Sequence, residues 1–298
     1  MPLVTVLIPA HNAAATLAET LDSLVQQTYR DFDILLVNDA SHDATVAIAR
    51  SYTDRLALRV LDLPQNLGVA GALNAGLAQI EAPYIARIDA DDLAMPNRLA
   101  EQIAYLESHP AIDVCSSAME IFYDDGSRPN EMLIKPSEDA RIKTALVQYA
   151  SMSHGASTFR KSFFDDVGGF DVRLDFAEDY DLWCRGALLG KCYTNLPLGL
   201  TKYRQHNHQV GKLRAQLQYD RDLVIKRKYL TALLGGQSSG HLAEFFSPVL
   251  RFTSKEVTAS VLEQVVPLLL QLAPRMPDQA YFAEIVAQCI ARHVRNCP

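Results

Sequence analysis

The feature that most constrains the fold is an alternation of two hydrophobic periods over the first hundred residues. Compact apolar runs typical of buried strands alternate with segments whose leucines recur at helical spacing. The predicted strands are 4–9, 34–37, 56–63 and 84–88, and the predicted helices are 14–27, 44–52, one through 73–80, and 96–106. Continuous apolar strands separated by helices predict an α/β fold, a mostly parallel sheet with helices on both faces.

The pattern changes after residue 92. We expect a long strand, a hairpin-like turn, a second strand and a helix at 112–122, 124–127, 154–159 and 179–189. From residue 211 onward the pattern is helical, and the Gly/Ser-rich segment 235–240 is the clearest linker in the chain. Two amphipathic helices, 261–272 and 282–290, follow it. These features predict a helical C-terminal extension over 211–298.

The charge of the chain limits its partners. There are 35 acidic side chains against 28 Lys and Arg, a net charge of −7, and no dense basic run. Because phosphate backbones are held by clustered positive charge, nucleic acid is not an expected partner. A small anionic ligand remains compatible with this charge when a divalent cation neutralises its phosphates.

Cysteine usage and the N-terminal residues bear on location. The five cysteines are scattered without a CxxC pair, which is typical of reduced thiols. The N-terminal residues run straight into a predicted strand, and the longest apolar stretch, near 261–272, is too short and too polar for a bilayer span. We therefore expect a cytoplasmic protein, either free or peripheral at the inner face of the membrane.

Polar clusters follow each of the first four predicted strands. They are His11 and Asn12, then Asn38, Asp39 and Ser41, then Asn66 and Gly68, and finally Asp89, Asp91 and Asp92. Each cluster alone is compatible with turn chemistry. Because the carboxyl ends of parallel strands meet at one edge of a sheet, where such sheets bind ligands, four clusters in succession indicate a site.

The strongest local signal is the turn Asp89-Ala90-Asp91-Asp92. Carboxylates two residues apart provide hard oxygen ligands for Mg²⁺ or Mn²⁺, which in turn bind a diphosphate. The alternative is a solvated acidic turn that caps the helix starting near Pro96. Three aspartates at one strand end repel one another unless a cation or ligand compensates, which favours the metal site.

The second signal is the acidic segment 178–183, Glu-Asp-Tyr-Asp-Leu-Trp. One interpretation is stabilisation of a helix N-terminus by acidic side chains. The other is a general base that removes a proton from an attacking hydroxyl, with Leu182 and Trp183 anchoring the helix.

The third signal is Tyr203-Arg204-Gln205-His206. His206 is either a metal ligand or a polar residue at a strand end. Arg204 pairs either with a phosphate or with a structural carboxylate, and the sequence does not separate these two roles. Three common motifs are missing from the sequence, namely the GxxxxGK[ST] phosphate loop, the full dinucleotide-binding glycine pattern and the GxSxG elbow.

In this order, the segments resemble the family-two glycosyltransferases with the GT-A fold. The resemblance covers about residues 3–210 and rests on segments 6–12, 37–43, 66–76, 89–92, 168–171, 178–179 and 203–206. It implies a GT-A (Rossmann-like) catalytic domain over 1–210, in which 1–110 binds the nucleotide sugar and 111–210 binds the acceptor. The extension matches no family that we can name.

The resemblance also implies roles for single residues. The nucleotide-binding set is Pro9, Ala10, Asn12, Asp39, Gly68, Asn74, Asp89 and Arg204. Asp91 and His206 are implied as ligands of Mn²⁺ or Mg²⁺, and Asp179 is implied as the catalytic base. The implied reaction is an inverting transfer of a sugar from a nucleotide-sugar donor to a hydroxyl of a saccharide or glycoconjugate acceptor.

Two departures from the family pattern concern the donor. His11 stands where Tyr is common, and Leu73 stands where many members carry Arg. UDP is the first choice of nucleotide. The alternative functions to a glycosyltransferase are a nucleotidyltransferase and a nucleotide-sugar-binding regulator or subunit without catalysis. For the extension, we expect that it forms a homo-oligomer, docks on a membrane face or covers the acceptor cleft.

Overall fold

The N-terminal part alternates strands and helices, as predicted. The computed structural model describes residues 1–298 apart from 125, 206–214, 248–258 and 296–298. The first strands are β1 (Val4–Ala10), β2 (Phe32–Asn38), β3 (Leu58–Asp62) and β4 (Tyr84–Arg87). The helices between and after them are α1 (Leu17–Val25), α2 (Thr45–Ser51), α3 (Gly68–Leu77) and α4 (Arg98–Ser108). All eight predicted elements are present, with bounds shifted by a few residues.

The middle of the chain is less regular. Its strands are β5 (Leu93–Ala94), β6 (Val114–Tyr123), β7 (Glu131–Leu133), β8 (Thr158–Arg160) and β9 (Tyr193–Gln205). Its helices are α5 (Asp139–Ala145), α6 (Lys161–Val167) and α7 (Glu178–Leu188), with short 3₁₀ turns η1 (His154–Ala156) and η2 (Val172–Leu174). The strand expected over 154–159 is therefore η1 followed by a three-residue strand.

Over the described residues, one nine-stranded sheet joins these strands in the order β3-β2-β1-β4-β8-β6-β9-β5, with β7 attached to β6. The first four strands are parallel, as expected. Beyond β4, β8 runs antiparallel to both β4 and β6, and β6 and β9 are parallel. At the edges, β5 pairs antiparallel with β9, and β7 pairs antiparallel with β6. The sheet as a whole is therefore mixed. The sequence did not predict the antiparallel strands, because apolar strand patterns do not encode strand direction.

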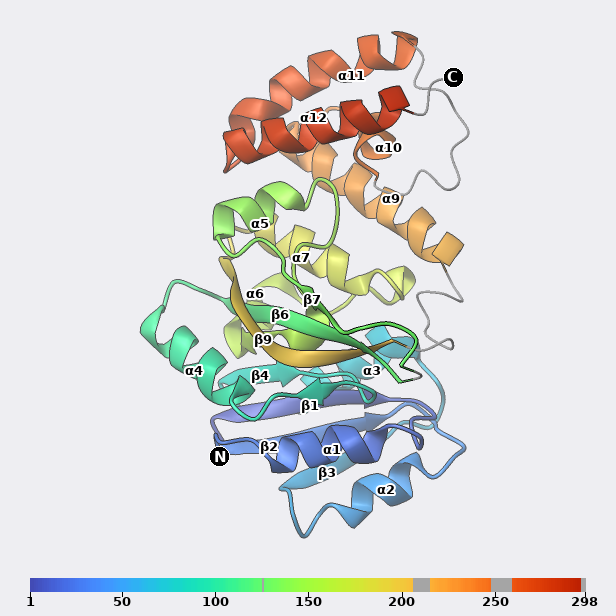
Figure 1. Ribbon diagram of the computed structural model, residues 1–298, viewed down its shortest axis with the longest axis vertical. Coiled ribbons are helices and arrows are strands. Elements are labelled where there is room, and N and C mark those ends of the chain that lie inside the picture. Colours follow the sequence, from blue (N-terminus) through green and yellow to red (C-terminus); the bar gives the residue numbers. More distant parts are fainter. Residues whose placement is uncertain (125, 206–214, 248–258, 296–298) are drawn as a thin grey trace.

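Each face of the sheet has its own core. Val4, Val6 and Ile8 of β1 pack with α1, α2 and α4, whereas Leu7 packs with α3, α6 and α7 on the other face. This separation follows from the period of two in a strand. The helices thus cover both faces, as predicted (Figure 1).

The C-terminal extension is helical in its described residues. It contains α9 (Ala215–Leu233), α10 (Leu242–Phe246), α11 (Ala259–Leu272) and α12 (Gln279–Arg295), stacked beyond α5 and α7 (Figure 1). Ile225 and Tyr229 of α9 belong to the same apolar core as Trp183 of α7. The Gly/Ser-rich segment 235–240 forms the short connection between α9 and α10. None of the helices over the described residues combines the length and the hydropathy that a bilayer span requires.

Candidate active site

The carboxyl ends of β1 and β2 bring several predicted residues together. Pro9 and Ala10 lie opposite Val37 and Asn38, and the amide of Asp39 donates to the carbonyl oxygen of Ala10 at 2.8 Å. The buried carboxylate of Asp39 accepts a bond from the amide of Leu67 at 2.7 Å, just before α3. Asp39 therefore fixes the turn that leads into α3.

The loops after β1 and β2 are tied together in an uncommon backbone conformation. Asn12 and Ala40 have φ angles of 51° and 54°, in the left-handed region. The amide of Asn12 donates to Ser41 Oγ at 2.9 Å, and its side-chain oxygen accepts from the amide of His42 at 2.9 Å. Non-glycine residues held in this region cluster at functional sites. These loops form one rim of the sheet edge.

The start of α3 requires glycine. Gly68 has a φ of 73°, and a Cβ at this position would lie 2.7 Å from Asp175 Oδ2. The other oxygen of Asp175 accepts from the amide of Ala70 at 3.2 Å. Gly68 thus lets Asp175, which the sequence analysis did not select, approach the first turn of α3.

Asn74 has partners other than those we expected. Its side-chain nitrogen donates to the carbonyl oxygen of Phe170, and its side-chain oxygen accepts from the amide of Phe170, both at 2.8 Å. The amide group is therefore occupied in joining α3 to the segment around Gly169 and Phe170. The role of Asn74 in nucleotide binding, which the resemblance implied, stays a prediction.

The aspartates of the acidic turn converge after β4. Asp89, Asp91 and Asp92 each offer a carboxylate oxygen, and these oxygens lie within 4.8 Å of one another. Asp92 is fully buried, and burial followed by the charges of Asp89 and Asp91 raises its pKa well above the usual range. One oxygen of Asp92 accepts from the amide of Arg204 at 3.0 Å, whereas the other has no hydrogen-bond partner. A buried, unpartnered carboxylate oxygen beside two further carboxylates fits a divalent cation.

Two residues missed by the sequence analysis pack against this turn. Arg87, at the end of β4, forms an ion pair with Asp89. Gly155 in η1 lies so close that a Cβ would be 2.9 Å from Asp89 Oδ2, 3.0 Å from Arg87 Nη1 and 3.3 Å from Asp92 Oδ2. The glycine therefore allows close approach of η1 to the carboxylates.

Of the two kinds of partner considered for Arg204, a phosphate or a structural carboxylate, the structure shows carboxylates. Its guanidinium pairs with Glu19 at 2.8 Å and with Asp124, and donates to the carbonyl oxygen of Asp91 at 2.8 Å. Arg204 thus holds the acidic turn from β9 and binds carboxylates, a different arrangement from the predicted nucleotide contact. His206, the other residue predicted in this segment, lies outside the described residues.

The start of α7 carries two carboxyl groups of perturbed pKa. Glu178 is 6% exposed, its Oε2 has no partner, and burial followed by the charge of Asp179 raises its pKa to about 8. Burial also raises the pKa of Asp179, although the charges of Lys135 and Arg87 act in the opposite direction. Asp179 Oδ1 accepts from the amide of Tyr180 at 2.7 Å.

The helix that carries these groups is anchored as expected. Leu182 and Trp183 are fully buried, and the Trp183 ring stacks on Phe159 with ring centroids 5.6 Å apart. The hydroxyl of Tyr193 donates to the carbonyl oxygen of Trp183 at 2.9 Å. The first turn of α7 is therefore held in place by β8 and β9.

Arg87 links the two carboxylate groups. It is buried, and its positive charge opposes the rise in the pKa of Asp92 at the acidic turn and of Glu178 and Asp179 at α7. One guanidinium therefore acts electrostatically on both groups of carboxylates.

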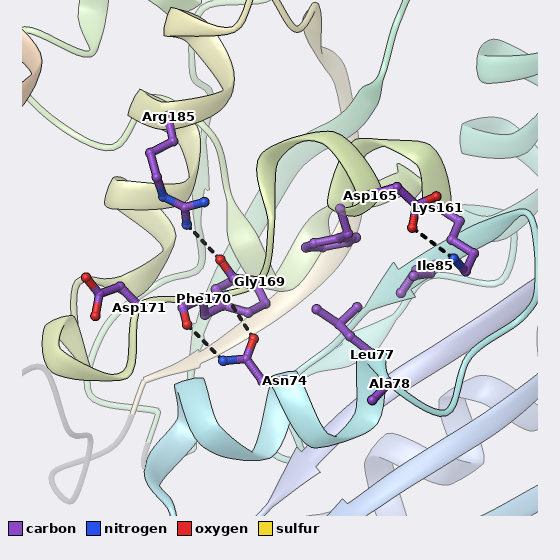
Figure 2. A pocket seen from close by; sticks show the side chains of 11 residues that line it. Asn74, Leu77, Ala78, Ile85, Lys161, Asp165, Gly169, Phe170, Asp171 and Arg185 are labelled. Atoms are coloured by element: carbon purple, nitrogen blue, oxygen red, sulfur yellow. Dashed lines mark hydrogen bonds and ion pairs between the residues drawn. The ribbon is translucent and has the colours of Figure 1, made fainter. Parts of the chain in front are cut away.

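A separate cavity of about 600 Å³ lies between α3 and α6 (Figure 2). It contains only one of the predicted residues, Asn74, among its lining. Its polar groups are paired with their neighbours: Lys161 with Asp165, and Arg185 with the carbonyl oxygens of Val167 and Gly169. The cavity is thus distinct from the carboxylates and presents no convergent set of unpaired polar groups.

Comparison with known proteins adds independent information. The family model described as "Glycosyl transferase family 2" matches residues 5–168. The amylovoran biosynthesis glycosyltransferase AmsE of Erwinia amylovora is 34% identical over 217 residues, which cover 70% of this chain and 79% of that protein. An uncharacterized glycosyltransferase of Haemophilus influenzae is 30% identical over 243 residues, covering 78% of this chain and 75% of its own length.

Solved structures support the fold. S. aureus TarS 1-349 in complex with UDP-GlcNAc has a TM-score of 0.67 at 19% identity, covering 98% of this chain and 88% of that one. The mannosyltransferase PcManGT from Pyrobaculum calidifontis, in complex with GDP-Man and Mn²⁺, has a TM-score of 0.60 at 18% identity and covers 97% of this chain and 75% of that one.

Proposed function

Because the chain belongs to glycosyl transferase family 2, we propose that it is a metal-dependent, inverting glycosyltransferase. The donor is a nucleotide sugar, with UDP as the first choice of nucleotide, and the acceptor is a hydroxyl group of a saccharide or glycoconjugate. The single observation that supports this proposal most strongly is the convergence of carboxylate oxygens of Asp89, Asp91 and Asp92 within 4.8 Å, with one buried oxygen of Asp92 unpartnered.

The rim formed by the loops after β1 and β2 is the proposed nucleotide site. Pro9, Ala10, Asn12 and Asp39 meet there, and Gly68 lies at the entry to α3. The two fold neighbours with bound nucleotide sugars carry UDP-GlcNAc and GDP-Man, so the screen described below includes sugars of both nucleotides. Asp89 is the residue proposed to face the ribose or the sugar.

The acidic turn is the proposed metal site. Asp91 would hold Mn²⁺ or Mg²⁺, with Asp89 and Asp92 beside it and His206 as the further predicted ligand. When bound, the cation neutralises the diphosphate of the donor and the charge that develops on it as it leaves. Arg204 contributes by fixing the backbone of the turn through the carbonyl oxygen of Asp91.

Asp179 is the proposed general base. It takes the proton of the acceptor hydroxyl while that oxygen forms a bond to the anomeric carbon and the bond to the nucleotide diphosphate breaks, which inverts the configuration. Burial and the charge of Asp179 raise the pKa of the neighbouring Glu178 to about 8, and one of its oxygens has no partner. We assign the role of proton acceptor to Asp179, whose negative form the charges of Lys135 and Arg87 favour.

The proposed role lies in polysaccharide or glycoconjugate synthesis. Support comes from the similarity to a protein named for amylovoran biosynthesis. Residues 1–210 form the proposed catalytic domain, with the acceptor bound over its second half. The extension is proposed to form a homo-oligomer, to dock on a membrane face, or to cover the acceptor cleft.

The function is tested by a thermal-shift screen of UDP- and GDP-sugars with and without Mn²⁺. A donor present at about 100 times its Kd stabilises the native state by about 2.7 kcal/mol. We expect one nucleotide sugar to raise the melting temperature when Mn²⁺ is present, and the same mixture to release free sugar slowly through transfer to water.

The alternatives give different results in the same samples. A regulator without catalysis binds the nucleotide sugar but releases no sugar over days. A nucleotidyltransferase consumes a nucleoside triphosphate with a sugar phosphate and releases pyrophosphate. If no nucleotide sugar binds under any metal condition, the proposed function is wrong.

A further inference from the structure

The segment 170–177 is attached to α3 before it enters α7. At its first residue, the side chain of Asn74 donates to the carbonyl oxygen of Phe170 and accepts from its amide, both at 2.8 Å (Figure 2). Near its end, Asp175 Oδ1 accepts a hydrogen bond from the amide of Ala70 at 3.2 Å. Residues four apart in a helix are neighbours on one face, so Ala70 and Asn74 present both attachments on the same side of α3.

The attachment through Asp175 lies at the N-terminus of α3. The first amides of a helix have no partner within the helix itself. Because α3 begins at Gly68, the amide of Ala70 is one of these, and Asp175 is its partner. The other oxygen of Asp175 lies against Gly68, where a Cβ would be only 2.7 Å away. A longer side chain than that of Asp175 would therefore have to displace one of the two segments.

The same turn of α3 is joined to the proposed nucleotide rim. The amide of Leu67 donates to the carboxylate of Asp39 at 2.7 Å. The next amide, that of Gly68, donates to Asn66 Oδ1 at 3.1 Å. Two carboxylates thus hold the start of α3, one from the end of β2 and one, Asp175, from the segment before α7. The start of α3 is therefore the junction between the rim and that segment.

Backbone hydrogen bonds lead from this segment into α7. The amide of Leu174 donates to the carbonyl oxygen of Asp171 at 2.9 Å, and the amide of Ala177 donates to that of Leu174 at 2.9 Å. The amide of Asp181 then donates to the carbonyl oxygen of Ala177 at 3.3 Å. Leu174 and Ala177 are also buried. Because Asp175 lies within this bonded series, a shift of Asp175 moves the start of α7.

The turn between Asp175 and α7 has a conformation that its surroundings must hold. Phe176 has a φ of 77°, in the left-handed region that bulky side chains rarely adopt. The guanidinium carbon of Arg221 in α9 lies 5.4 Å from the centroid of the Phe176 ring. Backbone conformations of this kind cost energy and persist only where neighbouring groups fix them. The direction in which the chain enters α7 is therefore set on both sides, by α3 and by α9.

We propose that Asp175 is a positioning residue, which fixes the start of α7, and with it the carboxylate of Asp179, relative to the nucleotide rim. This inference rests on the proposed function for its meaning in catalysis. The mechanical link between α3 and α7 is a property of the ligand-free protein and is measured separately. The role depends on an acceptor oxygen at the right distance from α3, and the charge of Asp175 is not required for it.

The first test measures donor turnover with Mn²⁺ in variants of Asp175. Asp175→Asn keeps the acceptor oxygen and loses the charge, Asp175→Ala loses both, and Asp175→Glu keeps the charge at the wrong length. We expect Asp175→Asn to retain kcat and the other two to lose about tenfold, since a misplacement of about 1 Å costs up to about 10²-fold. The donor KM of Asp175→Ala should stay within about threefold of wild type, because the rim is held independently by Asp39.

The matched control removes the same kind of bond at another helix. Asp278 accepts from the amide of Tyr281 at 2.9 Å at the start of α12, and Asp278→Ala is expected to keep wild-type kcat. Equal kcat in Asp278→Ala and Asp175→Ala overturns the inference. So does the reverse order within the series, in which Asp175→Glu is active and Asp175→Asn is not, because that order assigns the effect to charge.

The second test is hydrogen–deuterium exchange of single amides in the ligand-free protein, followed by NMR. In Asp175→Ala the amide of Ala70 should exchange at least about tenfold faster, because its charged partner is lost. The amide of Asp181 should exchange faster as well, whereas Asp175→Asn and Asp278→Ala should leave both amides at their wild-type rates. If Asp175→Ala does not fold, Asp175→Glu provides the same comparison.

The two tests separate the inference from the proposed function. A fast Ala70 amide with an unchanged Asp181 amide shows that the contact does not reach α7, and the inference is then wrong. Absence of donor turnover in the wild type contradicts the proposed function, and the exchange rates still decide whether Asp175 links α3 to α7.

Discussion

The acidic turn and the start of α7 place the same chemical group in two environments. At the acidic turn, carboxylate oxygens of three aspartates lie within 4.8 Å of one another, and Arg87 forms an ion pair with Asp89. At α7, burial raises the pKa of Asp179 and of Glu178, and the charge of Arg87 opposes both shifts. Crowded carboxylates favour a cation, whereas desolvated carboxyl groups near a fixed cation favour proton transfer. Environment, and not residue type, separates the two proposed roles.

The largest expected effect is that of Asp179→Asn. Transfer and donor hydrolysis should fall by about 10²–10⁴-fold, because loss of a general base removes that much rate. Donor affinity with Mn²⁺ should stay within about threefold of wild type, since the metal site is untouched. Initial rates and calorimetric titration give the two quantities. Wild-type turnover in this variant would move the role of base to Glu178 or Asp181.

Asp91→Asn should instead weaken the binding of the donor. We expect the Mn²⁺-dependent part of donor binding to disappear, with at least a tenfold loss of affinity, because one of the hard ligands is lost. Chelation of the metal from the wild type should give a similar loss. Asp165→Asn, an exposed site at the other cavity, is the matched control. Equal donor affinity with and without Mn²⁺ in the wild type would remove the distinction between the two regions.

Gly155→Ala tests the packing against the acidic turn. The added methyl group meets Asp89, Arg87 and Asp92 at 2.9–3.3 Å, so the turn must shift. We expect about a tenfold loss in metal-dependent donor binding, equivalent to about 1.4 kcal/mol. Gly199→Ala is the control, because its methyl group meets the flexible end of Met132 at 2.8 Å. Similar donor binding by both variants would show that η1 does not shape the turn.

The last expected effect concerns the stability of the fold, and not turnover or donor binding, and it follows from the pKa of a group in α7. The pKa of Glu178 is raised to about 8 in the folded protein, so the folded state keeps this proton after the unfolded state has lost it. The free energy of unfolding should therefore fall between pH 5 and 8, by at most about 1.4 kcal/mol per pH unit from this group. Glu178→Gln should remove that part of the slope. Urea unfolding of both proteins at pH 5, 6, 7 and 8 measures it, and parallel pH profiles would contradict the prediction.

Much of the N-terminal half was predictable, because strand and helix periods are strong there and the polar clusters follow strand ends. The acidic turn was identified for the same reason, whereas the acidic segment 178–183 was identified from carboxylates at the first turn of a predicted helix. Their assigned functions stay predictions until the variants above are measured.

The rest depends on contacts between distant segments. Lys135, Gly155 and Asp175 acquire meaning only when their loops reach the sheet edge, and each is an ordinary residue in its local sequence. The guanidinium of Arg204 had two compatible kinds of partner, and only the fold shows its pairing with carboxylates. The bonds of Asn74 with the Phe170 backbone likewise appear only in the fold. The direction of the strands after β4 likewise depends on which strands pair, and not on the local sequence of each strand.

The shared core of α7 and α9 has a consequence for how such chains diversify. Ile225 and Tyr229 lie in the same apolar core as Trp183, and burial, together with the charge of Asp179 in α7, raises the pKa of Asp222 in α9. Replacement of the tail by recombination or by design would thus change the support of α7 along with the outer surface. Shortened versions that end before α9 would lose the apolar backing of the helix that carries the proposed base.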